Sequence, residues 1–166
     1  MTTLVTAFVT VLGVGYLRPA SGTWGSLAAF PLGYAVWLGT GALGFGVVTL
    51  IVTILGVRAT ARYIETRNSK DPSEVVIDEV AGQWIALLPV AVGASARGLE
   101  PWDMYPGLIV GFLLFRLFDI WKPGPVGWMD RRGDAFGVMF DDVIAGIFAA
   151  LGVVALAAIA HGVLTG

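Results

Sequence analysis

Two pairs of adjacent carboxylates are the residues of this sequence best suited to chemistry. They are Asp78-Glu79 and Asp141-Asp142, and each pair stands immediately before an apolar run. One acid in the first turn of a helix is explained by capping, because a negative charge stabilises the positive end of the helix dipole. Capping needs only one carboxylate, however, and two adjacent ones repel each other. Two such pairs therefore favour a hard-cation site, in which Mg²⁺ takes carboxylate oxygens and keeps water or phosphate as its other ligands. Capping stays the alternative for either pair taken alone.

The two pairs share a short local pattern. The sequences Asp78-Glu-Val-Ala-Gly82 and Asp142-Val-Ile-Ala-Gly146 both read D-x-x-A-G. In a helix, the small residues three and four positions after each Asp lie on the same face as the Asp. Small residues let neighbouring helices approach closely. The pattern therefore predicts that two helices pack beside the acids and bring the two pairs together.

A second group of charged residues ends a later apolar run. Arg116, Asp119 and Lys122 are spaced three residues apart, so they lie near one another at a helix end. Pro123 is expected to stop that helix, and Pro125 to keep the following loop extended. Basic residues that meet anionic lipid would explain Arg116 and Lys122. That alternative leaves Asp119 unexplained.

Two further segments carry groups suited to an anion. Asp130 is followed by Arg131 and Arg132, whose guanidinium groups can bind phosphate through two hydrogen bonds. A solvated loop is the alternative there. Residues 18–26 form a Gly/Ser/Thr loop that enters a helix, and backbone N–H groups at such a place can hold an anion. A plain turn with a Ser or Thr cap is the alternative, and the P-loop pattern G-x-x-x-x-G-K-[ST] is absent.

The elements that must position these groups are membrane helices. Hydrophobic residues make up 57% of the 166 residues and charged residues only 13%, so an aqueous domain could not cover its surface. The charge-free stretches are 1–17, 19–57, 80–96, 104–115 and 143–166. We expect an all-α, polytopic helical bundle with about four transmembrane helices, formed as one domain over residues 1–166. The expected spans are 24–38 and 42–60 (a hairpin broken at Gly39-Thr40-Gly41), 80–97, 104–118 and 143–163. Residues 4–17 are too short to cross and predict a re-entrant or interfacial helix.

Basic residues set the expected orientation. They gather in the windows 58–79 and 116–142, as Arg58, Arg62, Arg67 and Lys70 and then Arg116, Lys122, Arg131 and Arg132. Ten of the twelve carboxylates lie in the same two windows. The expected spans place both windows on one side, which the positive-inside rule makes the cytoplasmic side.

Several classes of protein are excluded. The chain has no Cys, and so no disulfide, zinc-thiolate site or cysteine nucleophile. A net charge of −2 argues against a nucleic-acid partner. The single histidine, His161, belongs to the far end of the last span and is expected to be interfacial. A histidine base or nucleophile at the acidic face is thereby excluded.

In combination, five motifs resemble the phosphatidylglycerophosphatase A family. They are the Ser21–Ser26 loop (S-G-T-W-G-S), Asp78-Glu79-x-x-Gly82, Arg116-x-x-Asp119-x-x-Lys122-Pro123-x-Pro125, Asp130-Arg131, and Asp141-Asp142-x-x-Ala145-Gly146. They occur in this order from about Gly15 to Gly146, which is nearly the whole chain. One departure is Ser21, where many members have Pro, and this is expected to change loop stiffness rather than chemistry.

The resemblance implies an Mg²⁺-dependent phosphatase of the bacterial inner membrane, with its active site facing the cytoplasm. It would hydrolyse phosphatidylglycerophosphate to phosphatidylglycerol and inorganic phosphate. The metal would be held by Asp78, Glu79, Asp141 and Asp142, and one or two ions fit that set. Asp119 or Asp130 would orient water or protonate the leaving alkoxide, and an aspartyl-phosphate intermediate is not excluded. The phosphate oxygens would be bound by Arg116, Lys122 and Arg131, assisted by Arg18, Ser21, Thr23 and Ser26.

Two other functions compete with this hypothesis. A non-enzymatic transporter or assembly subunit could use the acidic face to bind cations, although transporters place ionisable groups near the bilayer midplane. A phosphotransferase acting on CDP-activated alcohols would need a D-G-x-x-A-R…G-x-x-x-D-x-x-x-D signature, which is absent. The sequence does not set the oligomeric state.

Overall fold

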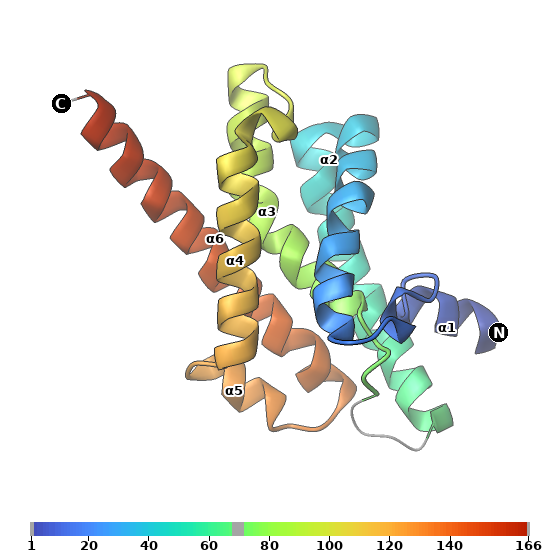
Figure 1. Cartoon of the computed structure of the whole chain (residues 1–166). Coiled ribbons are helices and arrows are strands. Elements are labelled where there is room, and N and C mark those ends of the chain that lie inside the picture. The colour runs from blue at the N-terminus through green and yellow to red at the C-terminus, as the bar shows by residue number, and fades with distance from the viewer. Residues whose placement is uncertain (1, 68–71, 166) are drawn as a thin grey trace.

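The computed structural model describes residues 2–67 and 72–165, and Lys70 lies outside them. These residues form helices with no strand among them, which confirms the all-α fold (Figure 1). The elements are α1 (Thr2–Val9), η1 (Val14–Tyr16), α2 (Ser21–Arg67), α3 (Ile77–Arg97), η2 (Pro101–Met104), α4 (Tyr105–Trp121), α5 (Pro125–Asp130) and α6 (Ala135–Thr165).

Four of these helices are long and apolar enough to cross a membrane, as predicted. They are α2, α3, α6 and α4, the last taken together with η2 as the stretch Pro101–Trp121. The 47-residue α2 is not straight, because Gly41 has φ 67° and ψ −173°. Only glycine adopts such a conformation without strain. The helix therefore folds into two arms that run side by side in opposite directions (Figure 1), which confirms the predicted hairpin.

The N-terminal segment is short, as expected. Helix α1 has eight residues, about 12 Å at 1.5 Å per residue, and cannot cross a bilayer. It is tied to the start of α3 by a hydrogen bond of 2.9 Å from the backbone N–H of Val76 to the carbonyl oxygen of Val9.

Helix α6 starts earlier than predicted. It begins at Ala135 rather than residue 143, so Asp141 and Asp142 lie two turns inside the helix. The cap is Asp134, whose Oδ1 accepts a hydrogen bond of 2.7 Å from the N–H of Gly137. Hydrogen bonds from Arg132 and from Gly137 lower the pKa of Asp134 and keep it a carboxylate. Asp134 thus caps α6, and the capping alternative does not apply to Asp141-Asp142.

Two other local predictions were wrong. Pro125 does not hold an extended loop but begins α5, where its fixed φ suits the first helical position. Residues 21–26 do not form a loop either, because α2 is helical from Ser21 onward. Their N–H groups therefore belong to the first turns of a helix.

The centre of the bundle is α3. It packs against α2, α4 and α6, and 67% of its spanning window is buried, against 17–28% for the other three. It meets α6 at Gly82 and Gly146. A Cβ atom on Gly82 would lie 2.6 Å from the carbonyl oxygen of Asp142, and one on Gly146 would overlap the carbonyl oxygen of Gly82. The small residues of the two D-x-x-A-G patterns therefore pack backbone against backbone, as predicted.

This contact yields a stability prediction. Because the atoms that a new Cβ would meet are backbone atoms, Gly146→Ala should force the helices apart and cost about 1–3 kcal/mol. The matched control is Gly162→Ala in the same helix, where nothing lies within 4 Å. We expect a lower thermal unfolding midpoint in detergent for Gly146→Ala only. Equal midpoints for the two variants would show that the backbone contact is not needed.

Candidate active site

A polar cavity of about 200 Å³ lies at one end of the bundle. It is bounded by the starts of α2 and α3, the end of α4, the loops before α3 and α6, and α6 itself. Eight of the predicted site residues line it: Ser21, Asp78, Glu79, Asp119, Lys122, Asp130, Asp141 and Asp142. Segments far apart in the sequence thus meet at one site.

Three carboxylates form the acidic centre of this cavity. Asp78, Glu79 and Asp142 each offer one oxygen, and these oxygens lie within 4.8 Å of one another. Asp78 is 7% exposed and Asp142 only 3%. The Oε2 atom of Glu79 is buried and has no hydrogen-bond partner among the described residues. Buried carboxylates this close need positive charge to balance them, and hard oxygen donors of this kind could hold a metal ion.

The fourth predicted metal ligand has a different neighbour. The ammonium of Lys122 donates a hydrogen bond of 2.8 Å to Asp141 and another to Asp130. Burial alone would lower the pKa of Lys122, but these two carboxylates outweigh it and raise the pKa above its ordinary value. Lys122 therefore stays cationic at neutral and alkaline pH. It is the C-cap of α4, with φ 51°, which turns the chain back toward α6.

Arg116 links α4 to α2 beside the cavity. Its Nη1 lies 2.6 Å from Asp119 and 3.4 Å from the hydroxyl oxygen of Ser26. Both side chains of the Arg116–Asp119 pair are largely buried, at 15% and 14% exposed. The Nε atom of Arg116 is buried without a partner among the described residues. Arg116 thus keeps a donor that a ligand could use.

The remaining predicted residues lie around the cavity rather than in its lining. Arg18 is exposed and donates to the hydroxyl of Ser73 at 3.0 Å. Thr23 lies in the second half of the first turn of α2, outside the lining. Arg131 lies beside α5, where a Cβ on Gly127 would be 3.3 Å from its Nη1. Arg131 therefore lies near the backbone of Lys122 but does not line the cavity.

Sequence reasoning missed Ser73. Its side chain receives the hydrogen bond from Arg18, its carbonyl oxygen accepts one of 2.6 Å from the hydroxyl of Ser21, and it lines the cavity. It stands in a polar segment without a motif. Only its position near Asp78 could have indicated it.

Comparison with known proteins gives a consistent result. The family model for phosphatidylglycerophosphatase A matches residues 7–157. A phosphatidylglycerophosphatase A of Haemophilus influenzae is 33% identical over 145 residues, covering 87% of this chain and 83% of its own. The Escherichia coli protein of that name is 32% identical over 145 residues, covering 84% and 78%. A Bacteroides thetaiotaomicron protein, provisionally named a phosphatidylinositol-3-phosphatase, is 38% identical over 143 residues and covers 84% of each chain.

No solved structure matches the chain significantly. The family model nevertheless covers α2, α3, α4, most of α6 and every residue that lines the polar cavity. The two curated relatives with the family's name cover most of the chain at about one-third identity. This chain belongs to the phosphatidylglycerophosphatase A family.

Proposed function

We propose that this protein hydrolyses phosphatidylglycerophosphate to phosphatidylglycerol and inorganic phosphate. The observation that carries the proposal is the group of three carboxylates, two buried and one half-buried, that shares a polar cavity with Lys122 at the end of a bundle of apolar helices. A lipid whose chains lie in the bilayer would present its phosphate at this level. The names of the two curated relatives supply the substrate.

We further propose that the metal is Mg²⁺. Asp78, Glu79 and Asp142 offer only hard oxygen atoms, and Glu79 has a buried oxygen without a partner. Both features fit Mg²⁺, which prefers carboxylates and keeps other positions for water and phosphate. When bound there, the metal would neutralise phosphate charge and lower the pKa of a bound water. Asp141 would serve as a ligand only if it left Lys122.

Different residues of the chain would then bind the phosphate and handle the proton. Lys122 would bind phosphate oxygens as a fixed positive charge, and Arg116 would add its unpaired Nε–H. The first turn of α2 at Ser21 would offer backbone N–H groups to the same anion. A water oxygen forms the new bond to phosphorus, the P–O bond to the lipid breaks, and the leaving alkoxide takes up a proton. Both Asp119 and Asp130 line the cavity, but Asp119 suits the proton-handling role better because its side chain is less exposed, at 14% against 40%.

The proposed location is the bacterial inner membrane, with the cavity facing the cytoplasm and residues 1–166 acting as one domain. Support comes from the apolar helices and the bacterial relatives. The basic residues near the cavity agree with the positive-inside rule. A transporter fits less well, because the carboxylates lie in the first turn of α3, the last turn of α4 and about two turns from the start of α6 rather than at mid-span.

A phosphoinositide is the second candidate substrate, because one relative is named for it. Both candidates are phosphomonoesters on a lipid head group, so the same cavity would serve either. They are separated by measuring phosphate release from phosphatidylglycerophosphate, phosphatidylinositol 3-phosphate and phosphatidic acid side by side. We expect at least a tenfold preference for phosphatidylglycerophosphate in kcat/KM. A preference for the inositol lipid would reassign the substrate.

The metal proposal predicts that purified protein in detergent releases phosphate only with Mg²⁺. Stripping with EDTA should abolish release, and adding back Mg²⁺ should restore it, because the buried carboxylates lose their counter-charge without the ion. Ca²⁺ is the control ion, since it prefers more ligands at longer distances. Full activity in EDTA would overturn the metal proposal.

Asp142 should be indispensable. Asp142→Asn keeps the shape but removes one of three charges from the acidic centre, so we expect kcat to fall by about 100-fold or more. The folded yield should stay the same by size-exclusion chromatography in detergent. The control is Glu65→Gln, an exposed acid of α2. Near-normal turnover of Asp142→Asn would mean that this carboxylate is only structural.

Lys122 should matter more than Arg131. Lys122→Ala removes the only ammonium that lines the cavity among the described residues, so KM should rise and kcat/KM fall by about 100-fold. Arg131→Ala should lower kcat/KM less, because Arg131 lies beside α5 and does not line the cavity. Exposed Arg62 of α2 supplies the control, Arg62→Ala. If Arg131→Ala lowers kcat/KM more than Lys122→Ala does, the phosphate would have to bind beside α5 instead.

A further inference from the structure

An apolar groove of about 330 Å³ lies between α2 and α4, away from the polar cavity. Both helices pack on α3, but they make few contacts with each other. One that they do make joins the rings of Phe30 and Phe112, whose centroids are 6.0 Å apart. The groove is lined by Leu27 and Phe30 of α2, Trp102 of η2, and Tyr105, Leu108, Ile109 and Phe112 of α4. In the bilayer its open side would face lipid, because both helices are membrane-spanning.

One end of the groove lies one helical turn from residues that border the active site. Leu27 directly follows Ser26, and Phe112 lies one helical turn before Arg116. Ser26 and Arg116 are themselves joined at 3.4 Å. A Cβ on Gly22 would lie 3.2 Å from the same guanidinium, so the side chain of Arg116 reaches across from α4 to the start of α2. The Ser26–Arg116 contact therefore lies between the groove and Asp119 of the cavity along α4.

The groove is apolar, and the polar group nearest to it along α4 is Arg116. One turn beyond the lining residue Phe112, Arg116 keeps a buried Nε–H without a partner among the described residues. The seven residues that line the groove itself are all leucine, isoleucine or aromatic. This order of polar and apolar groups matches a phospholipid, whose head group is followed by hydrocarbon.

The length of the groove also fits. Arg116 and Tyr105 are eleven positions apart on α4, or about 16 Å at 1.5 Å per residue. The hydrocarbon of one leaflet is about 15 Å deep, half of a bilayer core. One extended acyl chain would therefore reach from the active site to the far end of the groove.

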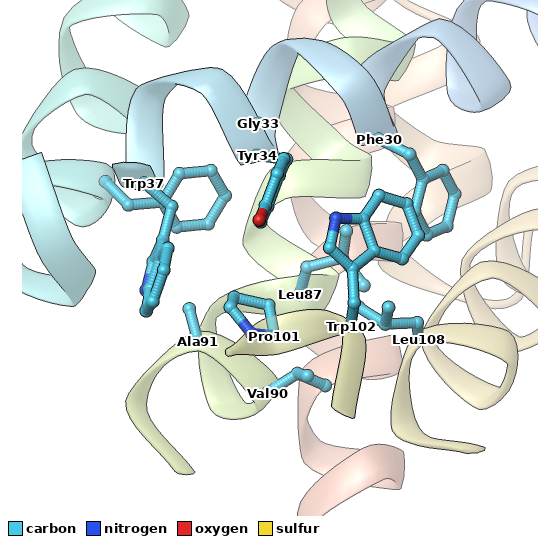
Figure 2. Close-up of a pocket in the computed structure, with 11 residues that line it drawn as sticks. Phe30, Gly33, Tyr34, Trp37, Leu87, Val90, Ala91, Pro101, Trp102 and Leu108 are labelled. Atoms are coloured by element: carbon cyan, nitrogen blue, oxygen red, sulfur yellow. The ribbon is translucent and has the colours of Figure 1, made fainter. Parts of the chain in front are cut away.

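Trp102 closes that far end. Its indole stands beside Phe30 and Leu108 (Figure 2), and these three residues line both the groove and a smaller apolar cavity of about 30 Å³ behind them. The indole packs edge-on against Tyr34, with ring centroids 5.5 Å apart. The Tyr34 hydroxyl donates a hydrogen bond of 2.5 Å to Glu100, next to η2. Trp102 is therefore held in place as a wall.

We propose that the groove binds one acyl chain of the lipid substrate while its phosphate occupies the polar cavity, and that Trp102 limits the length of that chain. This inference rests on the proposed function. The lipid enters sideways from the bilayer between α2 and α4. The binding energy of the chain then holds the phosphate at Lys122 and the three carboxylates.

The first test compares long and short substrates. Ile109→Trp fills the middle of the groove, and its control, Leu113→Trp, adds the same bulk to α4 outside it. The two positions are similarly exposed, at 53% and 58%. Rates are measured in detergent micelles with phosphatidylglycerophosphate carrying two hexadecanoyl or two hexanoyl chains. A six-carbon chain is too short to reach Ile109 from Arg116.

We expect Ile109→Trp to lower kcat/KM about tenfold more for the hexadecanoyl than for the hexanoyl substrate, the scale on which apolar pockets discriminate. Leu113→Trp should show no such difference. Equal losses on both substrates, or equal behaviour of the two variants, would mean that only bulk lipid occupies the groove. Should the unaltered protein hydrolyse neither substrate, the proposed function itself would fail, which is a different result.

The second test concerns Trp102 as the limit on chain length. Trp102→Ala joins the groove to the small cavity behind it, so the ratio of octadecanoyl to hexadecanoyl turnover should rise about threefold. Because both substrates meet the same variant in the same micelles, a loss of folded protein cancels in the ratio. An unchanged ratio would overturn the role of Trp102 as the limit on chain length.

Discussion

The site depends on the contact between the backbones of α3 and α6 at Gly82 and Gly146. The acids Asp78 and Asp142 are each four positions before one of these glycines. When the two helices touch at the glycines, both acids are carried to the same side of the crossing. Any side chain at either position would separate the helices and with them the carboxylates. The acidic centre is thus a consequence of helix packing, and it needs no loop to hold it together.

Close packing creates an electrostatic problem that the rest of the cavity addresses. Six carboxylates line the cavity, and Lys122 is the only cation among the described lining residues, with Arg116 at its border. Lys122 balances Asp141 and Asp130, and Arg116 balances Asp119. Asp78, Glu79 and Asp142 are left over, and they are the three whose oxygens converge. Negative charge is therefore most concentrated at these three carboxylates, which have no lysine or arginine ion pair among the described residues, and a divalent cation would offset most of it there.

The sequence predicted the elements better than their ends. Gly39-Thr40-Gly41 marked the hairpin, because a glycine with positive φ leaves a local signal. The start of α6 was predicted too late in the chain, because the pair Asp141-Asp142 was expected to stand just before an apolar helix rather than inside it. Asp141 and Asp142 lie inside the helix instead, since Gly82 and Lys122 from other elements accommodate them. The site residues were largely predictable from motifs. Ser73 and the position of Arg131 were not, because both depend on how distant segments meet.

The contact between Arg116 and Ser26 lies between the polar cavity and the lipid-facing groove. On one side of it lie the carboxylates and Lys122, and on the other the apolar groove begins. A lipid phosphate taken from the bilayer into an ordinary aqueous pocket would have to expose its chains to water, at a cost that grows with every methylene. In the proposed arrangement, the phosphate reaches the carboxylates while the chain lies in the groove and stays in an apolar environment. Helix α2 therefore has to carry both functions: its first turns border the polar cavity, and the next turn forms one wall of the groove.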